Sequence, residues 1–239
     1  MKDKNFTLSK SLIHFYLTFA VRVWIGGMLC ALLASAQDPS ASSSPTIHQL
    51  RKTTESYEQL LRLVKQTDSG VNFKEFRLAY ADSDEYKPSA EPEVRSAMFG
   101  ALSAKDYARA AELAEAILKD RYVDIYGHQV AAVAYRELGD RAQANIHGSL
   151  ARELVRSIVE SGDGQSPESA MQLISEDEES VILQALQLKM VGQELIDVDG
   201  HTYDRVDALD SGDGEVTLYF NLDVPVIKVK QRLAAMPLP

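Results

Sequence analysis

The chain has 239 residues and a net charge of −10, with 45% hydrophobic and 25% charged residues. These proportions are those of an ordinary globular protein with enough apolar side chains for one large domain or two small ones. The acidic charge argues against nucleic-acid and anionic-membrane partners, because phosphate contacts need clustered lysine and arginine.

Residues 1–36 have the pattern of a secretory signal peptide. Basic residues precede or interrupt an apolar run over residues 23–34, and the run ends in Ala34-Ser35-Ala36, which fits a signal peptidase site. Arg22 leaves the uncharged run shorter than the roughly 20 residues that span a bilayer, which favours cleavage over a retained anchor. We therefore expect an exported, periplasmic or extracellular protein without a stable membrane span after cleavage. Loss of four basic residues and one acidic residue would change the net charge to −13.

The next segment, residues 37–46, is rich in serine and carries two prolines, which predicts a flexible linker. Helical periodicity then begins. An apolar stripe from Leu50 to Val64 predicts a first helix, and Asn72 is placed to cap a second helix that ends near Asp82. Residues 83–92 are polar with two prolines and are predicted to form a loop.

Residues 93–160 carry the clearest helical signal. Apolar residues between Ala110 and Leu118 share one helical face, Asp124 is placed to cap a second helix, and Asp140 a third that Gly162 ends. Residues 105–110 align with residues 139–144 at an offset of 34, the period of tetratricopeptide repeats. The match spans under two repeats, so we predict a tetratricopeptide-like helical bundle, residues 47–162, completed by the earlier helices.

The remaining residues, 163–239, change from helical to strand periodicity. A short strand at 170–174 and a helix at 178–188 are predicted first, and further strands are predicted at 195–198, 203–209 and 215–222. Asp199-Gly200 and Asp213-Gly214 separate these strands, and Asp-Gly is a strong hairpin signal. The predicted fold class is therefore α+β, mainly α, with a small C-terminal antiparallel β-meander packed on the helical bundle.

Several short segments resemble one protein family. They are Phe76–Tyr80, Tyr86–Pro88, Gly139-Asp140, Ser161–Ala170, Leu173–Ser175, Glu178-Glu179, Tyr203-Asp204 and Leu218–Asn221. Their order and spacing are similar to the signature of a bacterial exported family known as domain of unknown function four-nine-one-nine. Ser180 departs from it, because a tyrosine is expected after the paired glutamates. The resemblance supports the fold and export, and implies no activity, cofactor or catalytic residue.

No strong catalytic motif is present, and the single cysteine, Cys30, lies in the predicted signal peptide. We therefore predict no cofactor and no metal site. The sequence Ser-Gly-Asp-Gly occurs at 161–164 and 211–214. These segments are either cation-binding turns or a helix stop and a hairpin turn, and the residues that follow them favour the second interpretation. The acidic run 176–179 is either a carboxylate site or the first turn of a helix capped by Ser175, and the helix is favoured.

His128 and His147 fall at inward positions of the repeat alignment, which predicts buried histidines. The alternative is that His147, Asp163 and Glu179 converge where the third helix meets the C-terminal region, as a base with carboxylate partners. Tyr203, Tyr219 and Phe220 lie on predicted strands and either pack on the helices or form a ligand-binding face.

Two functional hypotheses follow. The leading one is a non-enzymatic exported protein- or peptide-interaction module of the cell envelope, because helix hairpins create surfaces for peptides. The alternative is a small hydrolase or metal-binding protein that uses His147, Asp163 and Glu179. The sequence leaves the oligomeric state open.

Overall fold

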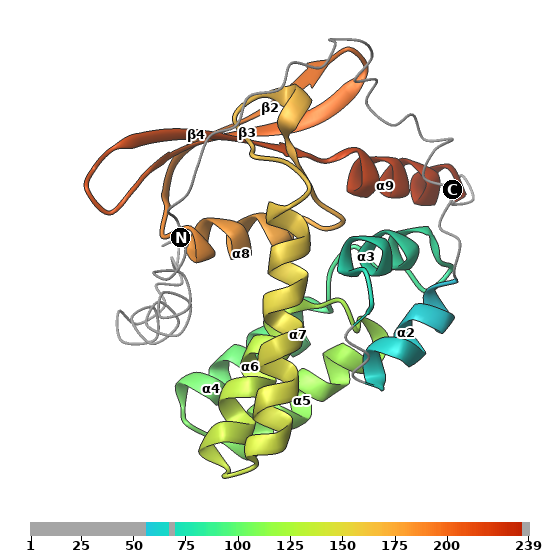
Figure 1. The fold of residues 1–239 in the computed structure, drawn as a ribbon, viewed down its shortest axis with the longest axis vertical. Coiled ribbons are helices and arrows are strands. Elements are labelled where there is room, and N and C mark those ends of the chain that lie inside the picture. Colours follow the sequence, from blue (N-terminus) through green and yellow to red (C-terminus); the bar gives the residue numbers. More distant parts are fainter. Residues whose placement is uncertain (1–55, 67–69, 236–239) are drawn as a thin grey trace, which may run out of the picture. The chain divides into compact units, whose positions relative to one another are not determined.

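The computed structural model describes residues 56–66 and 70–235, within a compact unit that spans residues 47–239 (Figure 1). The predicted signal peptide, the predicted linker and Leu50 lie outside the described residues. The described part contains eight α-helices and one four-stranded mixed sheet, which confirms the α+β class with mainly helical content. The helices are α2 (Tyr57–Lys65), α3 (Phe73–Asp82), α4 (Pro92–Ser103), α5 (Tyr107–Asp120), α6 (Ile125–Glu137), α7 (Arg141–Val159), α8 (Asp177–Ala185) and α9 (Asp223–Ala235).

Helices α4 to α7 form two helix hairpins whose turns are related by the 34-residue offset. Each turn contains a residue in the left-handed region, Lys105 with φ 61° and Gly139 with φ 87°. The carboxylates of Asp106 and Asp140 follow, and each accepts a hydrogen bond of 3.1 Å from the backbone N–H three residues ahead. The N–H of each aspartate also donates to the carbonyl five residues back, which closes the preceding helix.

The other predicted helix starts are also determined by local chemistry. Asn72 and Asp124 cap α3 and α6 as predicted, through hydrogen bonds from Glu75 N and Gly127 N. The predicted cap at Ser175 is wrong. Helix α8 begins one residue later, after Glu176, and no side chain caps its first turn. Three acidic residues in that turn complement the positive end of the helix dipole instead.

One hydrophobic core joins the helices to the sheet. Its buried members come from α2, α3, α6, α7, α8 and α9, from three of the four strands and from the segments between them, so the C-terminal region packs directly on the helical region. The members of this core that are at most 1% exposed are Phe76, Tyr80, Leu154, Ile158, Leu173, Ile174, Ile182, Val206 and Phe220. The ring of Tyr57 on α2 stacks on Phe76 and meets Tyr80 edge-on, which closes the core on the α2 side.

The sheet has the strand order β1-β4-β3-β2, with β1 (Met171–Gln172), β2 (Lys189–Val198), β3 (His201–Leu209) and β4 (Glu215–Asn221). The predicted meander is present as β2, β3 and β4, and β1 adds a short parallel strand beside β4. Strand β2 starts six residues before the predicted strand. The sequence does not predict its first part, because a β-bulge between Met190 and Gly192 interrupts the alternation of side chains along the strand.

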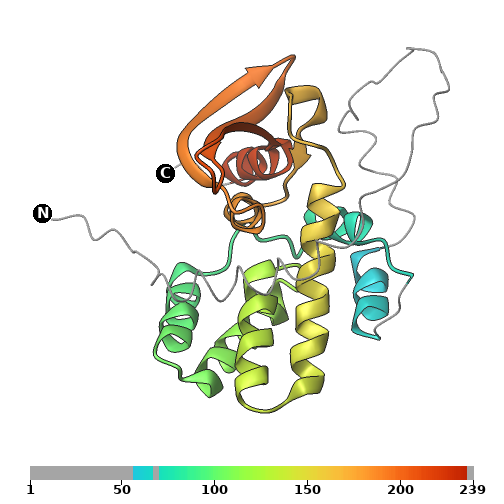
Figure 2. The same cartoon turned by 60° about the vertical axis from the view of Figure 1, so that its left-hand side comes forward.

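Asp199 and Gly200 both have positive φ, 52° and 85°, as a two-residue type I′ hairpin requires. Helix α9 follows β4 and was not predicted, and Asp223 at its start accepts hydrogen bonds from Thr202 N and His201 Nδ1. The sheet curves over α8 and α9 (Figure 2). Within the described ranges, no helix has the length and apolar character needed to cross a membrane.

Candidate functional site

Strand β2 forms an open edge of the sheet. It is ten residues long, and its neighbour on one side is β3. Among the described residues, no backbone group of 189–198 bonds to a loop, a cap or a further strand. The opposite edge differs, because β1 has only two residues and packs against α7. A long edge strand with free N–H and C=O groups is a template for another extended chain.

Apolar side chains along this edge are exposed to solvent. Met190 is 39% exposed, Val191 58% and Leu195 65%, although Leu195 pairs with the buried residue Asp204 on β3. Directly opposite residues of an antiparallel pair point to the same face of the sheet. The side chain of Leu195 therefore lies on the core-facing side of the sheet, at its edge, beyond the helices that cover β3.

A buried pair of carboxyl groups lies behind this edge. Glu179 in the first turn of α8 is 6% exposed and Asp204 on β3 is 5% exposed. Gln193 of β2 donates through Nε2 to Asp204 Oδ2, and the same nitrogen lies 3.5 Å from Glu179 Oε1. The three residues thus join α8, β3 and the middle of β2.

The electrostatics of this pair favour a bound proton. Burial, then a hydrogen bond to Asp204 and the charges of Asp204 and Glu176, raise the pKa of Glu179 to about 8. Arg205, the next residue on β3, does not offset this, because it pairs with Asp207 at 2.9 Å and with Glu194 at 3.8 Å. At neutral pH one carboxyl of the pair therefore stays protonated.

His147 lies in a different network, on the inner side of α7. Its Nδ1 is 2.9 Å from Nδ1 of His128, and its Nε2 is 3.1 Å from Glu115 Oε1. Nε2 of His128 is 2.8 Å from the carbonyl of Tyr122, and the hydroxyl of Tyr135 donates to Glu115. Both histidines are buried, as predicted from the repeat alignment.

Hydrogen-bond partners determine where the protons of this network lie. The Tyr122 carbonyl can only accept, so His128 carries its hydrogen on Nε2 and accepts from His147 on Nδ1. Burial lowers the pKa of His128 to about 4, and the hydrogen bond with His147 lowers the pKa of Glu115. Each ring nitrogen of the two histidines therefore has a partner within hydrogen-bond distance, which leaves none free to act as a base.

Asp163 lies in a third place, an exposed turn after α7. Its Oδ1 accepts from Gln165 N at 2.9 Å and from the Ser169 hydroxyl at 2.5 Å, and this second bond lowers its pKa. A Cβ on Gly162 would lie 2.3 Å from the Ser169 carbonyl oxygen, so this turn requires glycine. The three candidates His147, Asp163 and Glu179 therefore have separate sets of partners.

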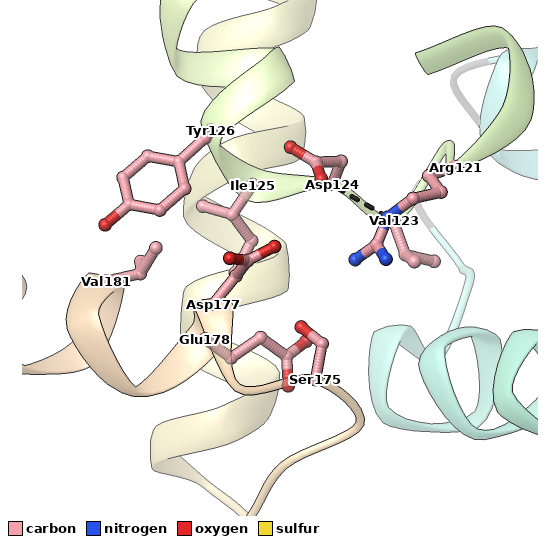
Figure 3. A pocket seen from close by; sticks show the side chains of 9 residues that line it. All are labelled: Arg121, Val123, Asp124, Ile125, Tyr126, Ser175, Asp177, Glu178 and Val181. Atoms are coloured by element: carbon pink, nitrogen blue, oxygen red, sulfur yellow. Dashed lines mark ion pairs between the residues drawn. The ribbon is translucent and has the colours of Figure 1, made fainter. Parts of the chain in front are cut away.

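Two further charged clusters connect the helices to α8. Arg77 bonds to both carboxylate oxygens of Glu178, at 3.0 and 2.6 Å. Arg95 bonds to Asp124 at 2.7 Å and to Asp177 at 2.8 Å. Arg121 and Asp124, together with residues of α8, line a small cavity (Figure 3). Its volume of about 10 Å³ is near the minimum that holds one water molecule.

Within the described ranges, no three histidine, cysteine or acidic side chains are grouped to hold a metal ion. Tyr203 and Phe220 are buried, whereas Tyr219 is half-buried.

Comparison with known proteins gives a family. The model described as Domain of unknown function (DUF4919) matches residues 47–231, so the chain belongs to this family. No curated protein and no solved structure shows significant similarity to it.

Proposed function

We propose that this member of the DUF4919 family is an exported, non-enzymatic interaction module that binds an extended polypeptide segment by strand addition to β2. The observation that carries the proposal is the ten-residue edge strand with exposed apolar side chains. In strand addition, backbone hydrogen bonds supply affinity and alternate side chains supply specificity. The histidine network supports a non-enzymatic function, because the ring nitrogens of His128 and His147 are already engaged.

The charge of the edge selects the partner. Glu194, Asp197 and Asp199 are exposed along the second half of β2 and its turn, and Lys189 lies at the other end. The whole chain carries a net charge of −10. A segment with alternating apolar and basic side chains complements this surface, whereas a second copy of the chain would bring the same negative charge. The occupant is therefore an extended, basic segment of another protein.

The test measures binding of three capped ten-residue peptides to the purified protein by isothermal titration calorimetry. One peptide alternates valine with lysine, the second alternates valine with glutamate, and the third is the first with a central proline. Only the unbroken lysine peptide is expected to bind. Equal affinity for the glutamate peptide would refute the proposed partner, and binding of none would refute strand addition.

Matched variants locate the binding surface. Leu195→Lys removes apolar area and adds a positive charge at the edge, and is expected to weaken binding about tenfold or more. Leu138→Lys is the control, because Leu138 is 51% exposed but lies at the end of α6. An equal loss in both variants would show that β2 is not the site. Analytical ultracentrifugation of the free protein tests the competing occupant, a second copy, and a monomer is expected.

Export is tested on the protein itself. The predicted signal peptide implies that the chain isolated from its own cells begins at Gln37. N-terminal sequencing of the cell-envelope or secreted fraction checks this, and a chain that retains residues 1–36 in the cytoplasm would contradict export.

A further inference from the structure

The Glu179–Asp204 pair lies where a side chain of β2, that of Gln193, bonds to the helix behind the sheet. Gln193 is the middle of β2, and its side-chain amide bridges Asp204 and Glu179. Helix α8 packs against β2, and its first turn supplies Glu179. The position of the edge strand therefore depends on how these two carboxyl groups are arranged.

One buried carboxylate oxygen of this pair lacks a hydrogen-bond donor within the described ranges. Asp204 Oδ1 is buried and receives no hydrogen bond from an N–H or O–H group of the described residues, although Oδ2 accepts from Gln193. Two ionised carboxylates can only accept. A proton held between the carboxyl groups of Glu179 and Asp204 supplies a donor that the pair otherwise lacks, and it removes one of two adjacent negative charges.

The surrounding charged groups do not replace this proton. On α8 and the residue before it, Glu176 adds a further negative charge, and Glu178 is taken by Arg77. The other arginine that bonds to α8, Arg95, pairs with Asp177 and Asp124. On β3, Arg205 pairs with Asp207, and with Glu194 of β2. Loss of the proton thus leaves two buried carboxylates side by side without a cation of these elements to neutralise them.

We infer that the proton shared by Glu179 and Asp204 is a pH-dependent switch that holds β2 against α8, and that its loss releases the edge strand. The consequence for partner binding rests on the proposed function: the peptide binds at acidic to neutral pH and is released at alkaline pH. The switch itself is a property of the free protein, so it can be measured without any partner.

Hydrogen exchange of the free protein tests the switch. Protection of the β2 amides, residues 189–198, is measured by mass spectrometry from pH 6 to 9.5 and corrected for intrinsic exchange. In the wild type, protection is expected to fall by up to about tenfold per unit as the pH rises from 6 to 8, and to level off above pH 8. Glu179→Gln keeps a hydrogen donor for Asp204 Oδ1 and removes the titration, so its protection is expected to stay constant.

Two further variants keep the test decisive. Glu215→Gln, at an exposed carboxylate on β4, is the matched control and is expected to behave as the wild type. Asp204→Asn places a donor on the other side of the pair and serves if Glu179→Gln does not fold. Constant protection of β2 in the wild type, or an equal fall in Glu179→Gln, would overturn the switch. Peptide titrations at pH 6 and 9 separate the two proposals, because a switch that opens in a protein that binds no peptide would refute only strand addition.

Discussion

Breaking the buried ion pair between Arg77 and Glu178 is expected to cost a large part of the folding free energy. Arg77 is 1% exposed and Glu178 4%, and two hydrogen bonds of 3.0 and 2.6 Å join them. Arg77 also donates to the Gln172 carbonyl, and Glu178 Oε2 accepts from Ile174 N at 2.8 Å. The pair thereby connects α3 to α8 and to the start of the sheet.

The magnitude follows from what each substitution leaves behind. Arg77→Met leaves a buried carboxylate and Glu178→Leu leaves a buried guanidinium, and removing one partner of such a pair costs about 3–5 kcal/mol. That is a large share of the roughly 5–15 kcal/mol that stabilises a domain. The double variant removes both charges and leaves no unpaired ion. It is therefore expected to be more stable than either single variant.

Urea denaturation followed by far-ultraviolet circular dichroism at pH 7 measures these differences. Circular dichroism is the suitable probe because the only tryptophan, Trp24, lies in the predicted signal peptide. Arg109→Met is the control: Arg109 pairs with Glu112 on the surface, where both side chains are at least 50% exposed, and a change below about 1 kcal/mol is expected. A double variant less stable than both single variants would refute the reasoning.

Three further predictions concern backbone strain and pH. Lys105→Gly is expected to raise the free energy of unfolding by about 0.5–1 kcal/mol, and Gly139→Lys is expected to lower it by a similar amount, because the backbone has positive φ at both positions. Urea midpoints that move the opposite way would contradict this prediction. Because the pKa of Glu179 is raised from 4.5 to about 8, the native state keeps a proton that the unfolded chain loses, so stability falls as pH rises through that window, by at most about 1.4 kcal/mol per unit. Thermal unfolding of Glu179→Gln should lack that fall, and an unchanged pH profile would count against the shared proton. The effect of His128 on stability has the opposite dependence on pH. Its pKa is lowered from 6.5 to about 4, so stability falls as the pH drops through that range. His128→Gln should remove this part of the acid sensitivity, and acid titrations followed by circular dichroism would show or disprove it.

Elements whose ends depend on local chemistry could be predicted from the sequence. Asn72, Asp124 and Asp140 each bond to a backbone N–H three residues ahead, so the residue type and its position suffice. The Asp199-Gly200 turn is equally local. Ser175 was the exception, because the chain enters α8 through Glu176 in a helical conformation and leaves no extended capping residue.

Features that depend on distant pairing could not be predicted in the same way. Strand β1 has two residues, and it exists because Met171 pairs with Phe220, 49 positions later. Helix α9 was missed because Val224, Val226 and Val229 are β-branched residues that favour strands, and its contact with β3 outweighs that preference.

In the buried carboxyl pair, one residue could be identified from local sequence and the other depends on distant strand pairing. The acidic run identified Glu179, but its partner Asp204 depends on the register of β3 against β2. A usable signal was present, because Asp204 has the same strand parity as Val206 and Ala208, which predicts an inward carboxylate. Gln193 had no such signal, because the bulge before it displaces the alternation of β2.

Residue-resolved amide exchange by NMR, with and without the alternating valine–lysine peptide at pH 6, measures strand addition directly. Added protection is expected at alternate amides of residues 189–198, the N–H groups that point away from β3, and nowhere in α4 to α7. Protection confined to those helices, or no change along β2 when the peptide is bound, would contradict the proposed binding edge.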